Sequence, residues 1–154
     1  MELTSILKPE AIKVLGSVSS KKRLFQEISE LAVVAHGLDG EASLEALLER
    51  ESLGPTGVGH GVALPHSRLD GLEGVKGAFL LLEKPIDFGS VDRQPVDLAF
   101  ALFAPTGAGV THLKALALVS RTLRDSTICS KLRSNPEPAK LYAILTEGQS
   151  VQAA

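Results

Sequence analysis

Two nearly continuous apolar runs constrain the fold of this 154-residue chain more than any other feature. They extend from Ala78 to Leu82 and from Val96 to Phe103, and both are as long as ordinary strands. A strand with one face in water alternates apolar and polar residues, whereas a continuous apolar run fits a strand that is covered on both faces. The sequence therefore predicts a layered α/β fold, with a sheet buried between other elements.

Helical patterns precede these runs. Ser19-Ser20 can cap a first helix, which is expected to end at His36-Gly37. A second, shorter helix is expected to stop before Gly54-Pro55, with Arg50 in its last turn. The segment from Gly54 to Gly61 holds four glycines and one proline and predicts a flexible loop without regular structure. The apolar positions that recur at intervals of three or four are Leu24, Ile28, Leu31 and Ala35 in the first helix, and Leu44, Leu47 and Leu48 in the second.

Further helical patterns follow the apolar runs. A longer helix is expected with Thr111 as its cap and His112 in its first turn, and shorter ones around Ile128 to Leu132 and from about Pro138 to Leu145. Helices at both ends of the sequence with strands between them predict a mixed sheet, an α/β (α+β) arrangement. We expect one domain over residues 1–148 and a frayed polar tail over residues 149–154.

The composition favours a single folded domain and argues against nucleic-acid and membrane partners. A chain of 154 residues that is 44% apolar can bury a core as one domain without disulfides or metal ions. The net charge of −2 and the lack of a basic stripe argue against nucleic acid as a partner. The single cysteine, Cys129, is interpreted as a small buried apolar residue in a reducing compartment. Without a leader pattern or an apolar run of about 18 residues, the chain is expected to be cytoplasmic and soluble, with no membrane insertion.

His66 is the residue best placed for chemistry. It follows Pro65 at the end of a short strand expected from Val62 to Leu64, behind a loop that contains Gly57, Gly59 and Gly61. A neutral imidazole is nucleophilic at physiological pH, and glycine N–H groups can bind phosphoryl oxygens. The spacing matches neither a P-loop nor a dinucleotide motif, so no nucleotide is indicated. A tight turn that needs positive φ angles explains the glycines equally well.

Two further residues fit an anion site. His112, in the first turn of a helix, lies beside unsatisfied N–H groups and the positive end of the helix dipole. Arg50 can add a forked, permanently charged donor if the loop folds back over the second helix. Taken singly, each residue is explained as well by ordinary helix-end preferences.

The other histidines are weaker candidates. His60 lies in the glycine-rich loop and His36 at a helix end, where surface histidines are common. His60, His66 and His112 could bind zinc together with a carboxylate, but their spacing fits no short ligand motif. We therefore expect no metal and no other cofactor.

Several blocks of the sequence resemble one protein family, the mannitol/fructose/nitrogen class of IIA proteins of the bacterial phosphotransferase system. The segment Thr56 to His66 is similar to the active-site signature of that class, and the other blocks are similar to its nitrogen-regulatory branch. They occur in the family's order and span about Leu3 to Leu145, so the resemblance covers a complete domain. The other blocks are Arg50-Glu51, Gln94 to Leu98 with Phe100 to Leu102, Thr111 to Leu113, Thr127 to Cys129 and Lys131 to Arg133.

The resemblance implies roles for individual residues. His66 would accept a phosphoryl group on Nε2 from a phosphorylated HPr-like carrier, supported by His112 and Arg50. It also implies a mixed sheet layered between helices in a single IIA-type domain. Two positions depart from the nitrogen type: His60 stands where relatives carry Asn, and Ser67 where Gly is common. Ser67 could add a hydroxyl donor to the phosphoryl group.

Three functions follow from these expectations. The first is a phosphohistidine carrier whose phosphorylation state regulates partner proteins, which family resemblance suggests are potassium-transport regulators or sensor kinases. The second is a free-standing IIA component for fructose or mannitol uptake, which passes its phosphoryl group to a separate IIB protein. The third is a IIA-like interaction module that is never phosphorylated. The sequence does not select the partners or the oligomeric state.

Overall fold

The computed structural model describes the backbone of residues 1–153 and the side chains of residues 1–147. The helices are the short 3-10 turns η1 (Leu3–Ser5) and η2 (Pro9–Ala11), then α1 (Lys21–His36), α2 (Gly40–Ser52), α3 (Gly109–Leu123), α4 (Ser126–Ser134) and α5 (Pro138–Ala153). The strands are β1 (Ile12–Leu15), β2 (Gly57–Gly59), β3 (Val62–Ala63), β4 (His66–Leu69), β5 (Lys76–Ile86) and β6 (Val96–Pro105).

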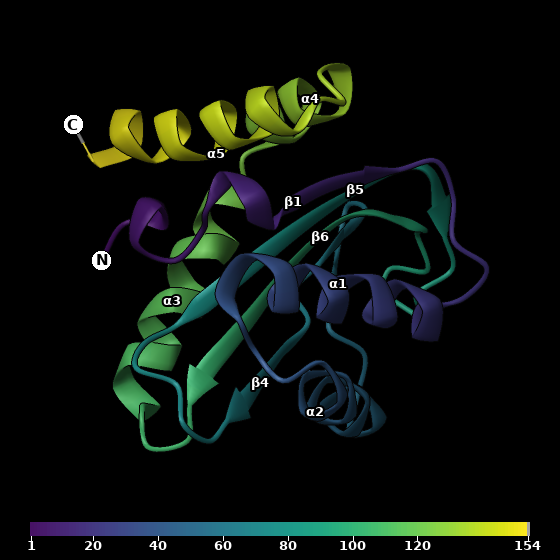
Figure 1. The fold of residues 1–154 in the computed structure, drawn as a ribbon. Helices are drawn as coiled ribbons and strands as arrows, with labels where there is room; N and C mark the ends of the chain where they lie inside the picture. Colours follow the sequence, from purple (N-terminus) through teal and green to yellow (C-terminus); the bar gives the residue numbers. More distant parts are fainter. Residues whose placement is uncertain (154) are drawn as a thin grey trace.

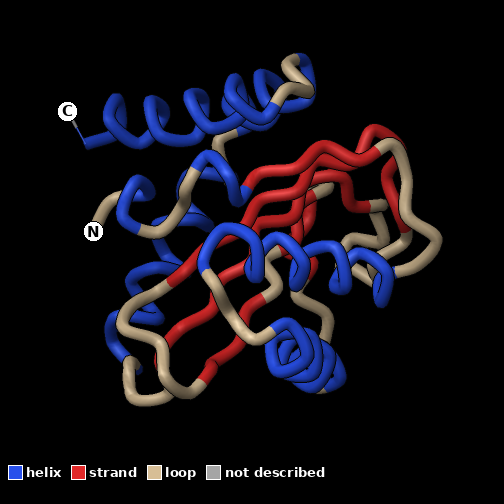
Figure 2. Tube along the Cα trace, viewed as in Figure 1, coloured by secondary structure: helices blue, strands red, loops and turns tan. Residues whose placement is uncertain are grey.

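The strands form a mixed sheet, as predicted, with the order β1-β5-β6-β3-β2 and with β4 also paired to β6. The long central strands β5 and β6 are antiparallel, whereas β1 runs parallel to β5, and both β3 and β4 run parallel to β6. These two central strands contain the apolar runs of the sequence (Figure 2), and their consecutive residues 77–82 and 98–104 are buried. The expectation of strands covered on both faces is therefore confirmed.

Helices cover both faces of the sheet (Figure 1). On one face α1 packs on β5 and α2 packs on β4, while α3 lies on the opposite face against β6. The C-terminal helices α4 and α5 pack together, and α5 contacts β1 and the N-terminal turns. This arrangement confirms the predicted sheet between helices. None of the helices in the described part of the chain is both long and apolar enough to cross a membrane.

β3 and β4 behave as one strand that is interrupted at Leu64-Pro65. Val62 pairs with Leu98 and His66 with Leu102, so both pieces keep the same register along β6. Proline has no N–H to donate, but the Pro65 carbonyl accepts from the Leu102 N–H at 2.9 Å and maintains the ladder. His66 therefore begins a strand, which corrects the expectation that it closes one.

The glycine-rich loop contains a hairpin, which corrects the prediction that it lacks regular structure. β2 and β3 are antiparallel and are joined by His60 and Gly61, whose φ angles are +57° and +82°. Two positive φ angles in a two-residue connection are typical of the hairpin turn that favours Asn-Gly. His60 fits this turn because His is among the residues that tolerate a positive φ angle.

The boundaries of two helices differ from those predicted. α3 begins at Gly109 with Ala108 as its N-cap and without a side-chain cap, so Thr111 lies inside the first turn. The Ala108 carbonyl accepts from the His112 N–H at 2.7 Å. The helix therefore begins with a backbone hydrogen bond and no side-chain cap. α5 continues past Leu145 to Ala153, because no proline follows Pro138 to stop it. Most of the expected tail thus has helical backbone, and residue 154 lies outside the described residues.

The close approach of β2 to the loop before β6 predicts that Gly57→Ala destabilises the fold. A Cβ at position 57 would overlap the Ser90 hydroxyl, and it would lie 2.9 Å from Ser90 Cβ and 3.3 Å from Phe88 Cδ1. We expect urea unfolding to show a loss of about 1–3 kcal/mol, as is usual for an overpacked core.

Gly74→Ala is the matched control, because a Cβ there meets nothing within 4 Å. Ser90→Gly combined with Gly57→Ala should recover part of the loss. Equal stability of Gly57→Ala and Gly74→Ala would contradict this account of the contact.

Candidate functional site

His66 has its tautomer set by the backbone. Its Nδ1 lies 2.8 Å from the carbonyl oxygen of Leu64, and a carbonyl can only accept a hydrogen bond. Nδ1 therefore carries the hydrogen, and in the neutral ring Nε2 keeps its lone pair. The Leu64 carbonyl stands two residues before His66, where β3 has ended and β4 begins. The side chain of His66 is only half-buried.

The surroundings favour the neutral form of His66. Burial lowers the pKa of its imidazole below the ordinary value of about 6.5. The hydrogen bond to Leu64 acts in the opposite direction, since it stabilises the protonated ring, while the positive charge of Arg50 lowers the pKa further and Glu51 raises it. A neutral, nucleophilic ring at physiological pH is the net result.

His112 lies against His66 from the other side of the site. The two ring centroids are 5.6 Å apart, with an interplanar angle of 71°. His112 is buried, with 6% of its surface exposed, and its Nε2 has no hydrogen-bond partner among the described residues. Buried polar atoms are normally paired, so an unpaired ring nitrogen beside a nucleophile indicates a group kept available for a ligand. Burial, with the neighbouring His66 and Arg68, lowers the pKa of His112.

Arg68 joins the site and was missed by the sequence analysis. Its Nε donates to Nδ1 of His112 at 3.4 Å, which leaves the hydrogen of the neutral His112 ring on Nε2. Arg68 stands two residues after His66, and side chains two apart on a strand share a face. The period of two could have identified Arg68, had the sequence indicated that His66 begins a strand rather than ends one.

Arg50 reaches the site from the last turn of α2. Its Nη1 donates to the Gly54 carbonyl at 3.0 Å, and it forms no ion pair with a carboxylate in the described part of the chain. Its charge acts on His66, as the lowered pKa of that histidine indicates. The helix end is therefore a source of positive charge held beside the nucleophile.

The neighbouring Glu51 fixes that helix end. Its carboxylate, 7% exposed, accepts from the N–H and the hydroxyl of Thr56 at 2.9 and 2.6 Å. Lys21, the first residue of α1, donates to the same carboxylate at 2.9 Å and lies 4.2 Å from the ring centre of Phe88. Glu51 thus connects α1, the end of α2 and the beginning of the hairpin, and it holds Arg50 in position.

The glycines of the hairpin have structural roles. Gly57 lies against Ser90, and Gly59 and Gly61 have positive φ angles beside Asp92 and Asp97. The N–H of His60 donates to the Asp92 carboxylate, so this backbone donor is already paired. The turn interpretation accounts for these glycines.

The remaining candidates lie away from the imidazole of His66. Ser67 is buried on the opposite face of β4 from His66, because successive side chains alternate, and its hydroxyl has no partner among the described residues. The Nε2–H of His36 donates to the Gly77 carbonyl at 2.8 Å. Residues 1–147 contain no group of three His, Cys, Asp or Glu side chains able to hold a metal, so His60, His66 and His112 do not form the zinc site considered from the sequence.

Comparison with known proteins defines the class. A family model described as "Phosphoenolpyruvate-dependent sugar phosphotransferase system, EIIA 2" matches residues 5–148. The chain belongs to this family of phosphotransferase-system IIA proteins, and a role in phosphoryl transfer follows from that membership.

The relatives define the branch. A nitrogen regulatory protein of Bradyrhizobium diazoefficiens is 48% identical over 145 residues, which are 94% of this chain and 95% of the relative. One of Escherichia coli K12 is 44% identical over 149 residues, 96% of this chain and 91% of the relative. The resemblance to the nitrogen-regulatory IIA proteins is confirmed.

Solved structures agree with this assignment. The crystal structure of nitrogen regulatory protein IIA-Ntr from Neisseria meningitidis has a TM-score of 0.85 and 36% identity, and the match covers 94% of this chain and 99% of that one. IIA mannitol from Escherichia coli, with a TM-score of 0.76, 20% identity and coverage of 90% and 97%, shares the fold.

The hydrogen bonds at the site predict the tautomers of both histidines. Above neutral pH, long-range nitrogen-15 spectra of the imidazole rings should show the Nδ1–H form for His66 and the Nε2–H form for His112. In Arg68→Leu, the preference of His112 should relax, because its acceptor nitrogen loses the donor, while that of His66 should remain. The Nε2–H form for His66 would refute the proposed nucleophile.

Burial of the imidazoles also predicts how stability depends on pH. His36, His66 and His112 all have a pKa lowered below the ordinary value, chiefly by burial. Below about pH 6.5 the unfolded chain then binds more protons than the folded one, so stability decreases as pH falls through the folded values. Urea unfolding at pH 7.5, 6.5 and 5.5 should give a decreasing free energy. A smaller decrease is expected for His36→Gln, and a rise on acidification would contradict the assigned directions.

Proposed function

We propose that this chain is a phosphohistidine carrier of the nitrogen phosphotransferase system. It accepts a phosphoryl group from an HPr-like protein on Nε2 of His66 and regulates partner proteins by its phosphorylation state. The observation that carries the proposal is the hydrogen bond between His66 and Leu64, because it leaves Nε2 as the free nucleophile. The nitrogen regulatory relatives support the choice of branch.

In the transfer step, the lone pair of Nε2 attacks the phosphorus of the phosphorylated carrier. The new nitrogen–phosphorus bond forms as the bond to the carrier breaks, and that electron pair leaves with the carrier's atom. The His66 ring keeps its hydrogen on Nδ1 and becomes positively charged, and the Leu64 carbonyl stabilises this charge. No proton needs to move for the group to transfer.

The neighbouring groups suit the negative charge that arrives. Phosphoryl transfer depends mainly on positioning and on donors that spread the charge of the phosphoryl oxygens. Arg50 and Arg68 supply positive charge from α2 and β4, and the unpaired Nε2–H of His112 supplies a buried donor from α3. Three separate elements therefore contribute one group each around His66.

Apolar side chains beside the site provide a surface that phosphorylation can change. Val110 and Leu113, in α3 on either side of His112 in the sequence, are 68% and 66% exposed. A partner that covers these side chains would meet the phosphoryl group at the same time. The added charge of about −1.5 to −2 would admit one partner and repel another by electrostatics alone.

Phosphorylation with the nitrogen-branch enzyme I, its HPr-like carrier and phosphoenolpyruvate tests the function directly. The wild type should yield an acid-labile phosphoprotein, and His66→Ala should yield none. His60→Asn is the matched histidine control and should be labelled normally, because it keeps the positive φ of the turn. Arg50→Lys keeps the charge but loses the planar forked donor, and His112→Gln replaces the imidazole Nε2–H with an amide donor of different reach, so each should slow labelling by about tenfold or more.

Gln is chosen at position 112 because the buried His112 would leave a cavity if it were cut back to Ala. Thermal unfolding of each variant separates a slow transfer from a damaged fold. Undiminished labelling of His66→Ala would overturn the assignment.

A further inference from the structure

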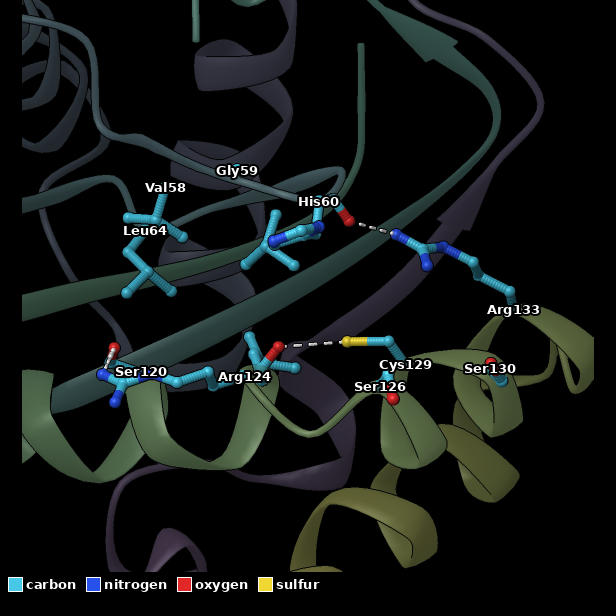
Figure 3. Close-up of a pocket in the computed structure, with 12 residues that line it drawn as sticks. Val58, Gly59, His60, Leu64, Ser120, Arg124, Ser126, Cys129, Ser130 and Arg133 are labelled. Atoms are coloured by element: carbon cyan, nitrogen blue, oxygen red, sulfur yellow. Dashed lines mark hydrogen bonds between the residues drawn. The ribbon is translucent and has the colours of Figure 1, made fainter. Parts of the chain in front are cut away.

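A cavity of about 520 Å³ lies between the β2–β3 hairpin and the junction of α3 with α4. Figure 3 shows Val58, His60 and Leu64 of the hairpin side facing Ser120, Arg124 and Cys129 of the helical side. His66, His112 and Arg50 do not line it. Its size falls within the range of about 300–1,000 Å³ that is usual for small-molecule sites.

The lining of the cavity is basic, although the chain as a whole has a net charge of −2. Arg124, Arg133 and His60 line the cavity, whereas none of the described residues that line it is Asp or Glu. Asp97 accepts from Arg133 at 2.8 and 2.9 Å and offsets its charge. Arg124 donates to the Ser120 hydroxyl at 3.2 Å and has no ion pair among the described residues. Arg124 is therefore the uncompensated cation of the cavity.

The opposite part of the lining is apolar. Val62, Leu64 and Leu123 are 2%, 6% and 4% exposed and form an aliphatic wall of the cavity. Cys129 adds a small side chain whose thiol donates to the Leu123 carbonyl, and burial raises the pKa of that thiol, so it stays neutral. The cavity thus combines an aliphatic wall with a cation and hydroxyl groups at its opening.

We propose that this cavity binds a small organic anion with an aliphatic body. Its carboxylate or phosphate would pair with the fork of Arg124 and the Ser120 hydroxyl, and its apolar part would pack on Leu64 and Leu123. A cationic ligand is disfavoured, because no carboxylate among the lining residues can pair with it.

Leu64 connects this cavity to His66. Its side chain lines the cavity, and its carbonyl accepts from Nδ1 of His66. A ligand that packs on Leu64 therefore acts on the group that orients the nucleophile, and its occupancy regulates phosphoryl transfer. This second part rests on the proposed function of His66, whereas the binding site does not.

Titration of the nitrogen-15-labelled, unphosphorylated chain tests the site with octanoate and octyl phosphate as probes. Octylamine is the control of equal chain length and opposite charge. Amide signals of Leu64, Leu123 and Ser130 should shift and saturate with the anions, and octylamine should leave them in place. Arg124→Gln should weaken octanoate binding by about tenfold or more, as expected for the loss of a charged hydrogen-bond donor.

Arg121→Gln is the matched protein control. It removes the same charge from the last turn of α3, but Arg121 does not line the cavity, so octanoate should bind this variant as it binds the wild type. Equal binding of octylamine and octanoate, or equal weakening in Arg121→Gln and Arg124→Gln, would overturn the proposed site.

Regulation is tested by the rate of phosphorylation with and without octanoate, at a concentration that occupies most of the wild type but little of Arg124→Gln. The rate should change at least about twofold in the wild type and Arg121→Gln, and clearly less in Arg124→Gln. A constant rate in all three proteins, with octanoate binding intact, would contradict the proposal that the ligand regulates phosphoryl transfer. Absence of labelling in every protein would instead reject the phosphocarrier function and leave the binding site standing.

Discussion

The continuous pairing of β6 with both β3 and β4 is the constraint on which the site depends. Because the two short strands keep one register, the residues between them cannot shift along the sheet. The Leu64 carbonyl, one residue before the Pro65 carbonyl that bonds to β6, accepts from Nδ1 of His66. This bond sets the tautomer of His66 and leaves the lone pair on Nε2.

The surroundings of His66 must suit both a neutral imidazole before phosphoryl transfer and a negatively charged phosphoryl group after it. Burial and nearby cations keep His66 neutral, so that its lone pair is available. The same cations suit the negatively charged product of phosphoryl transfer. The Leu64 carbonyl adds a weaker opposing effect, since it stabilises the positive ring that forms after attack. Glu51 also opposes the cations, and its bonds to Thr56 and Lys21 give it a mainly structural role.

Much of the fold could be read from local patterns. The helix capped by Ser20 and the buried strands β5 and β6 follow from spacing and from continuous hydrophobicity, which act over a few residues. The start of α3 could not be read in this way, because its cap is supplied by the backbone of Ala108 rather than by a side chain. The hairpin at residues 57–63 could not be predicted, because its glycines are also typical of an irregular loop. In the structure they allow the turn and the close contact of Gly57 with Ser90.

By itself, the sequence identified His66, His112 and Arg50 as candidate site residues and showed their resemblance to a known signature. Only the tertiary structure decided how they are arranged. The imidazole of His66 donates to the Leu64 carbonyl, that of His112 accepts from Arg68, and burial sets the direction in which each pKa moves. The bond of His66 spans only two residues, but the bond of His112 joins residues 44 positions apart and burial depends on the whole fold, so no local pattern encodes these two effects. The basic cavity beside Leu64 arises for the same reason, since its two walls come from segments about sixty residues apart in the sequence.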